Sequence, residues 1–143
     1  MGKINWGRVI AGGLLAGAVL NVFDWVLNGV VLMDEWNAAM TALGKGDMGG
    51  GMILWFVVFD FLLGIAMISL YAAIRPRFGA GPQTAAWAGL FVWFLLWFLH
   101  ALGEAPLGLF PANLYWITVA AGVVYVPLAA VVGAWPYKEE AAA

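Results

Sequence analysis

Four long apolar runs dominate this 143-residue sequence and leave few folds open to it. They cover approximately residues 8–33, 51–74, 84–103 and 113–135. Each is close to the ~20 apolar residues that a helix needs to cross the hydrocarbon core of a bilayer. A backbone in lipid must satisfy its own hydrogen bonds, so such runs fold as helices. We therefore predict an all-α integral membrane protein, a four-helix bundle that forms a single transmembrane domain over residues 1–143.

The composition agrees with a membrane setting and excludes several classes of function. Only 10% of the residues are charged, and the chain has no cysteine. The lack of cysteine rules out disulfides, thiolate metal sites and a cysteine nucleophile. The net charge of −2 comes without a basic block, so the lipid bilayer, and not a nucleic acid, is the expected partner.

The basic residues are distributed unevenly between the two sides of the predicted membrane. One side holds Lys3, Arg8, Arg75, Arg77 and Lys138. The loops on the other side hold only Lys45. Basic loops stay in the cytoplasm, so both termini are predicted to be cytoplasmic in a multi-pass protein of the cell membrane.

The segment between the first two spans has a helical pattern of its own. Residues 34–43 carry apolar side chains at helical spacing, which predicts a short helix lying on the outer surface. Aromatic rings favour the membrane–water interfaces. The rings predicted to lie there are Trp6, Trp36, Trp55, Trp87, Trp135 and Tyr137.

Four ionisable residues interrupt or border the apolar runs: Asp24, Asp60, His100 and Glu104. Such groups are costly in a bilayer unless they are paired, hydrated or bound to a ligand. At about 1.5 Å per helical residue, Asp24 and His100 lie roughly 24 Å from the cytoplasmic start of their spans, and Asp60 about 14 Å below its outer start. Glu104 falls at the outer mouth of its span. This agreement in depth predicts one shared site in the outer half of the membrane.

Further residues share helix faces with this group, since positions three, four or seven apart on a helix lie on one side. Asn21 and Asn28 flank Asp24, while Trp93 and Trp97 lie on or near the face of His100. We predict a polar pocket that binds a cation or a small ligand. Its predicted lining residues are Asp24, Asp60, His100, Glu104, Asn21, Asn28, Trp93 and Trp97.

The same four ionisable residues also form a candidate ligand set for a divalent metal such as Zn²⁺, Mn²⁺ or Fe²⁺. No metal motif of recognised spacing accompanies them. Haem is a weaker alternative, with His100 as one axial ligand and Met67 or Met33 as the other. Copper is weaker still, because methionine is common as apolar filler. The methionines near the outer loop are Met33, Met40, Met48 and Met52.

Two other classes of function remain open. The protein could be a structural or accessory subunit of a larger membrane complex, or form a homo-oligomer. Gly13 and Gly17 share the face of Asp24, and small residues let a second helix approach closely. A membrane-embedded enzyme would instead use His100 and Glu104 as an acid–base pair. A network of polar contacts that serves only assembly would explain the same residues.

The first third of the chain resembles a known family. The similarity rests on Ile4-Asn5-Trp6, on the small-residue first span, and on the stretch from Glu35-Trp36 to Leu43-Gly44. These patterns are similar to those of small bacterial four-helix membrane proteins of unknown function. The resemblance implies a four-helix fold in a bacterial inner membrane and implies no activity. Asp24 is not part of the family pattern, so no functional residue is carried over.

Overall fold

The computed structural model describes residues 3–46 and 49–139, and helices account for most of them. The α-helices are α1 (Trp6–Val26), α2 (Met33–Ala42), α3 (Gly50–Phe78), α4 (Pro82–Trp93), α5 (Leu99–Glu104) and α6 (Ala112–Ala134). The remaining helical turns are the π-helical η1 (Leu27–Val31) and η2 (Phe94–Phe98) and the 3₁₀-helical η3 (Ala105–Leu107). The prediction of an all-α fold is confirmed.

These segments combine into four long helices. Helix α1 continues through η1, and α4 continues through η2, α5 and η3. The four units are Trp6–Val31, Gly50–Phe78, Pro82–Leu107 and Ala112–Ala134, each long and apolar enough to cross a membrane. The predicted number of spans is thereby confirmed by length and composition. The predicted short helix after the first span is also present, as α2.

One helix end differs from the prediction. The second span was predicted to end near residue 74, but α3 runs through Pro76 to Phe78. A proline in the last turn removes only one backbone donor, and the helix tolerates that loss there. The helix ends where Gly79 takes a φ of 91°, a left-handed conformation that glycine adopts without strain.

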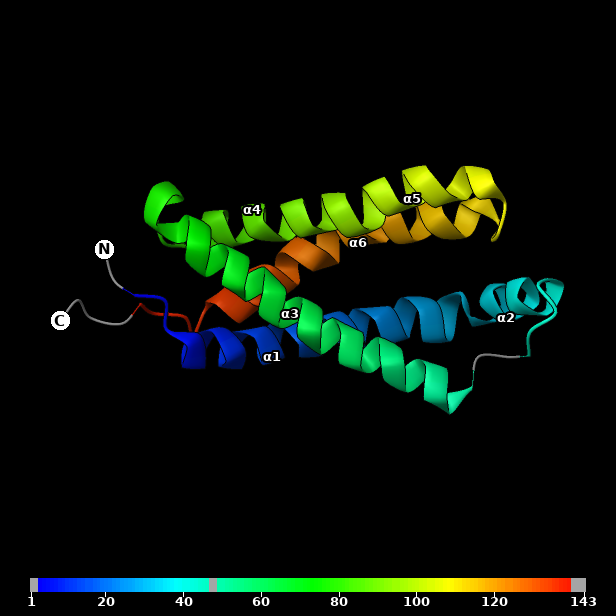
Figure 1. Cartoon of the computed structure of the whole chain (residues 1–143), viewed down its shortest axis with the longest axis horizontal. Coiled ribbons are helices and arrows are strands. Elements are labelled where there is room, and N and C mark those ends of the chain that lie inside the picture. Colours follow the sequence, from blue (N-terminus) through cyan, green and yellow to red (C-terminus); the bar gives the residue numbers. More distant parts are fainter. Residues whose placement is uncertain (1–2, 47–48, 140–143) are drawn as a thin grey trace.

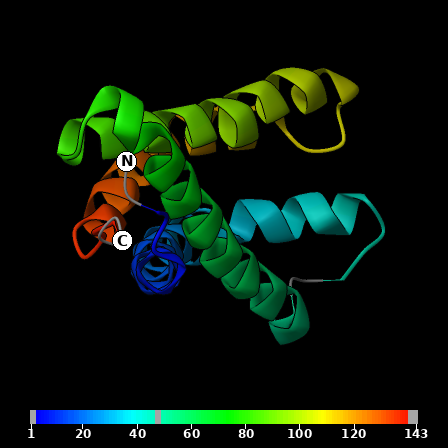
Figure 2. The ribbon, with the colours of Figure 1, turned by 60° about the vertical axis from the view of Figure 1, so that its left-hand side comes forward.

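The long helices form two hairpins that pack closely at one end of the molecule. Helix α1 packs mainly against α3 and α6, and α4 packs mainly against α6. Both termini and the turn between α3 and α4 lie at this end, which we call the terminal end (Figure 1). Toward the opposite end, α3 diverges from α4 and α5, as Figures 1 and 2 both show. The helix pairs therefore separate in the half that carries α2.

Glycines allow the close contact between α1 and α3. A Cβ atom at Gly13 would clash with the backbone of Ile65, and one at Gly17 would lie 2.7 Å from Cα of Phe61. A Cβ atom at Gly64 would clash with the Gly13 carbonyl. The close approach expected at Gly13 and Gly17 thus takes place within the chain, against α3.

The terminal end is closed by contacts between its basic residues and the C-terminal segment. Arg8 Nη1 donates to the carbonyl of Pro136 at 2.7 Å. Arg75 pairs with Glu139 at 3.5 Å and lies over the ring of Tyr137, with its guanidinium carbon 5.4 Å from the centroid. Tyr137 is buried here against these contacts, and its predicted position near a membrane–water interface stays a prediction.

Candidate functional site

Helices α1 and α3 bring two of the predicted site residues together. Asp24 is half-buried, whereas Asp60 is only 4% exposed. Their carboxyl groups interact directly, at hydrogen-bonding range. Two carboxyl groups can share a hydrogen bond only when one of them carries a proton, because an ionised carboxylate is acceptor-only. We refer to Asp24 and Asp60 as the acidic pair.

A tyrosine from α6 completes the centre of this site. The hydroxyl of Tyr125 donates to Oδ1 of Asp24 at 2.7 Å, across 101 residues of sequence. Tyr125 is itself buried, so this short bond fixes α6 against α1. The predicted pocket omitted Tyr125, although it lies at helical spacing from Thr118 and Gly122 in the fourth apolar run. Its spacing from these residues was the available signal.

A chain of hydrogen bonds joins the acidic pair to α2. Asn28 donates from Nδ2 to Oδ1 of Asp24 at 3.3 Å, and Nε1 of Trp36 donates to Oδ1 of Asn28 at 3.1 Å. Asn28 lies in the π-helical turn η1, a distortion often found at functional sites. Trp36 was predicted as an interface residue, and the structure adds this polar role.

The second asparagine has a different role. Asn21 uses its side-chain amide to donate to the carbonyls of Gly17 at 2.9 Å and Val57 at 3.3 Å. The bond to Gly17 lies within α1, and the bond to Val57 ties α1 to the backbone of α3 one turn away from Asp24. The position of Asn21 therefore supports a role in packing more directly than a role in ligand binding.

Aromatic rings surround Tyr125 and hence border the acidic pair. Phe23 stacks on Tyr125 with centroids 5.4 Å apart and an interplanar angle of 8°. Trp97 meets the same ring edge-on at 6.2 Å and 84°. We call Phe23, Trp97 and Tyr125 the aromatic cluster. Trp93 lies on the same side of α6, but its indole donates to the carbonyl of Val119 at 2.9 Å.

The other two ionisable residues form a separate pair, which we call the rim pair. His100 Nε2 lies 3.4 Å from Oε2 of Glu104, with side chains 53% and 41% exposed. Tyr115 donates from its hydroxyl to the same Glu104 oxygen at 3.3 Å. Because α5 diverges from α3, no ion pair or hydrogen bond between the rim pair and the acidic pair is found among the described residues.

The predicted four-ligand metal site is not assembled. Across residues 3–46 and 49–139, no group of three or more His, Cys, Asp or Glu side chains is placed to hold a metal ion. For the haem alternative, the pairing of His100 with Met67 lacks support, since Met67 is fully buried in the core while His100 is exposed, and the pairing with Met33 stays a prediction. Met48 of the copper alternative lies outside the described residues.

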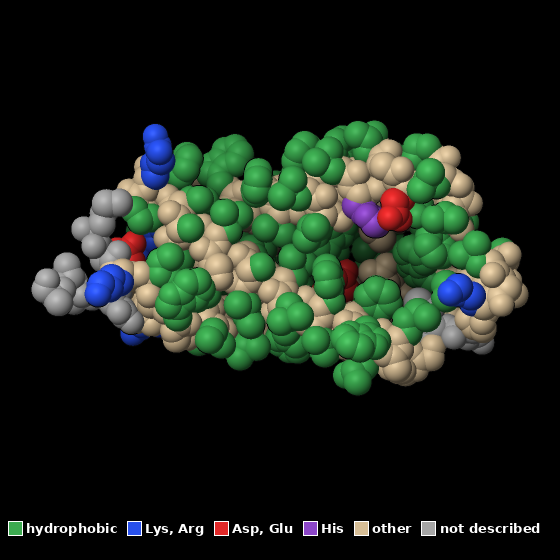
Figure 3. Space-filling view, in the orientation of Figure 1, with side chains coloured by type: hydrophobic (Ala, Val, Ile, Leu, Met, Phe, Trp, Pro, Cys, Tyr) green, Lys and Arg blue, Asp and Glu red, His purple; other side chains and the backbone are tan. Residues whose placement is uncertain are grey.

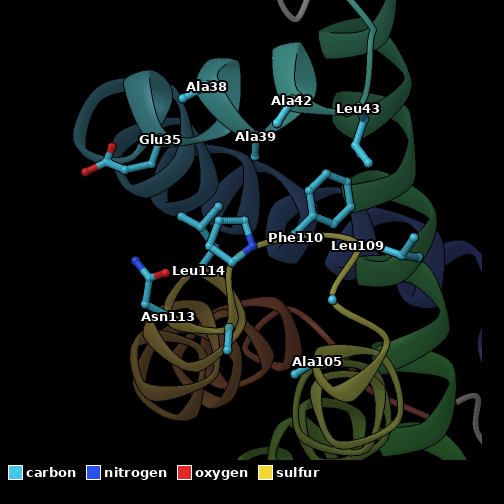
Figure 4. A pocket seen from close by; sticks show the side chains of 13 residues that line it. Glu35, Ala38, Ala39, Ala42, Leu43, Ala105, Leu109, Phe110, Asn113 and Leu114 are labelled. Atoms are coloured by element: carbon cyan, nitrogen blue, oxygen red, sulfur yellow. The ribbon is translucent and has the colours of Figure 1, made fainter.

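Two openings lie in the half where the hairpins separate. Figure 3 shows a hollow between the α4–α6 hairpin and the α1–α3 pair, with acidic atoms at its base and histidine atoms at its rim. A second groove of 740 Å³ lies between α2 and the segment before α6. Figure 4 shows it lined mainly by apolar side chains such as Ala39, Phe110 and Leu114, with Glu35 and Asn113 on one side.

Comparison of the chain with protein-family models, curated proteins and solved structures found no match. The resemblance to small bacterial four-helix membrane proteins therefore stays a prediction. The functional interpretation rests on the geometry of the acidic pair and its surroundings.

Proposed function

We propose that this protein crosses the cell membrane four times, with both termini cytoplasmic, and binds a cation or a small cationic ligand at the acidic pair. The observation that carries the proposal is a buried acidic site without a countercharge. Two carboxyl groups from separate helices meet there, and among the described residues neither forms an ion pair with Lys or Arg.

The surface of the long helices supports the membrane part of the proposal. Many large apolar side chains project outward along their length, and a water-soluble protein of this size rarely exposes so much apolar surface. Examples are Val22, Trp25, Leu54, Trp55, Leu62 and Val124. On the face in Figure 3, Lys and Arg side chains appear only near the two ends of the long axis. The terminal end holds most of them, which favours a cytoplasmic position for that end.

Electrostatics support the cation part of the proposal. A hydrogen bond between Asp24 and Asp60 requires a proton on at least one of them, so the pair carries at most one negative charge. Burying that charge without a partner is unfavourable in a low-dielectric interior. Tyr125 and Asn28 supply hydrogen bonds to Asp24 but no positive charge. A bound cation would supply the charge that the protein does not.

Isothermal titration of the full chain, purified in mild detergent, tests this proposal. The titrants are chloride salts of Na⁺, K⁺ and tetramethylammonium. We expect saturable binding of at least one of them, lost in Asp60→Asn. The matched control is Glu104→Gln, which makes the same chemical change in the rim pair and should bind as the parent does. Circular dichroism checks that both variants keep their helices. Equal binding by Asp60→Asn and the parent would refute the assignment of the site.

The glycine faces do not supply independent support for the accessory-subunit alternative. Gly13, Gly17 and Gly64 are used in contacts between α1 and α3 of the same chain. An assembly role and an enzymatic role for the rim pair both stay predictions, and cross-linking in native membranes would reveal a defined partner.

A further inference from the structure

We infer that the ligand of the acidic pair is an organic ammonium ion with apolar substituents on its nitrogen. This inference rests on the proposed function and narrows it to one class of ligand. Three features of the site support it: a buried carboxyl that faces another carboxyl and, among the described residues, no cation, an aromatic cluster around the tyrosine bonded to that second carboxyl, and a hollow that opens between the hairpins.

The first feature is the environment of Asp60. This residue is 4% exposed, and its carboxyl faces Asp24. Among the described residues, no donor outside the pair hydrogen-bonds to it, although buried polar groups normally have such partners. Tyr125 and Asn28 both donate to Asp24 instead. The position thus lacks a positive or donating group that a ligand could provide.

The second feature is a shortage of oxygen ligands for an inorganic cation. Hard metal ions prefer a shell of several oxygens. Asn28 cannot readily contribute, because its amide nitrogen donates to Asp24 and its oxygen accepts from Trp36. Among the described residues, the other side-chain oxygen that hydrogen-bonds to the pair is the Tyr125 hydroxyl. An alkylated ammonium needs no such shell, since its charge is spread over the carbons around nitrogen.

The third feature is the aromatic cluster. Phe23 and Trp97 both pack against the ring of Tyr125, whose hydroxyl contacts Asp24 directly. Aromatic faces attract cations through their quadrupole, and alkylated ammonium groups are typically bound by such rings together with a negative charge. The acidic pair would neutralise the nitrogen while the rings contact its apolar substituents.

The hollow gives those substituents space. It opens sideways between the hairpins, in the half where α3 diverges from α4 and α5 (Figures 1 and 3). Exposed apolar side chains occur on the helices at both sides of the hollow. Examples are Phe56 and Phe59 on α3, and Leu96 and Leu99 on the helix that runs from α4 to α5. In a membrane, this side of the bundle faces lipid. A ligand with an apolar body fits such an opening better than a fully hydrated ion does.

The test uses a matched pair of probes on the full chain in mild detergent. Benzyltrimethylammonium carries the charge, and neopentylbenzene has the same shape without it. We expect the charged probe to bind and its neutral isostere to bind at least about tenfold more weakly, as loss of a desolvated cation–π and charge contact implies. Asp60→Asn should abolish binding of the charged probe. Trp97→Leu should weaken it by about tenfold, and Trp97→Phe should largely restore it, because a ring is kept.

Leu107→Ala, on an exposed side chain away from the cluster, is the control for altered detergent binding. Equal binding of the two probes would overturn the inference, because charge would then play no part. Binding of Na⁺ or K⁺ that depends on Asp60, without binding of benzyltrimethylammonium, would also overturn it and would leave the proposed function standing. If no cation binds, both the proposed function and the inferred ligand class are refuted.

Discussion

The two halves of this molecule use the same four helices in opposite ways. At the terminal end, arginines close the end against the C-terminal segment, and from there to the middle of α1 and α3 glycines bring backbones into contact. In the other half, the helix pairs separate, π-helical turns interrupt two helices, and polar groups meet around Asp24. Where backbones are in contact, there is no room for a ligand. Where the helices separate and only polar side chains meet, there is room for one. The difference assigns the close packing to one half and the proposed ligand site to the other.

The largest effect should come from disrupting the glycine contact. In Gly64→Val, the new Cβ would clash with the Gly13 carbonyl and with N of Gly17, both backbone atoms that cannot move aside easily. We expect a loss of about 3 kcal/mol or more in unfolding free energy, at the upper end of overpacking effects. Unfolding in mixed micelles with increasing SDS measures it.

Gly103→Ala is the control for this substitution. Nothing lies within 4 Å of a Cβ at Gly103. This residue lies in α5, in the half where the helix pairs separate. Alanine has a higher helix propensity than glycine, so stability should stay equal or rise slightly. Similar destabilisation by both substitutions would contradict the contrast between the halves.

The next effect concerns the hydrogen bond from Tyr125 to Asp24, which joins α6 to α1. Tyr125→Phe removes the donor to Asp24 while keeping the ring between Phe23 and Trp97. Removing this short bond, whose donor is buried and whose acceptor is half-buried, should cost about 1–3 kcal/mol. Tyr115→Phe removes the corresponding bond to the half-exposed Glu104, where water can replace it, and should cost less. An equal loss in both variants would show that burial does not distinguish the two sites.

The sequence predicted the helix packing toward the terminal end better than the contacts in the half where the helix pairs separate. Span number followed from hydropathy, and the role of Gly13 and Gly17 followed from their spacing, because both depend on local pattern. Agreement in depth correctly put Asp24 beside Asp60. Depth could not show that His100 lies apart from these two residues, because depth says nothing about the lateral distance between diverging helices.

Trp36 and Tyr125 show a second limit of sequence reasoning. Trp36 bonds to Asn28, which lies in the π-helical turn η1 just before α2. No residue pattern in the sequence predicts a π-helical turn. The bond of Tyr125 to Asp24 spans 101 residues, so it depends on how α6 packs against α1. Both contacts arise from tertiary geometry, which helical periodicity alone does not specify.

A smaller effect should link α2 to the acidic pair. Trp36→Phe and Asn28→Leu each break the chain of hydrogen bonds that ends on Asp24. If the chain acts as a unit, the double variant should lose less stability than the sum of the single losses, with a coupling of about 0.5–1.5 kcal/mol. Strict additivity in the same SDS unfolding assay would show that α2 is held by its apolar contacts alone.

The smallest effect should come from the rim pair. His100→Gln with Glu104→Gln removes an ion pair whose side chains are 53% and 41% exposed. Exposed pairs contribute about 0–1 kcal/mol, because water and salt screen them. We expect the double variant to unfold close to the parent and to bind the cationic probe as the parent does. A clear loss of binding with unchanged stability would instead assign the rim pair to the same ligand as the acidic pair, since only a ligand that spans the hollow touches both.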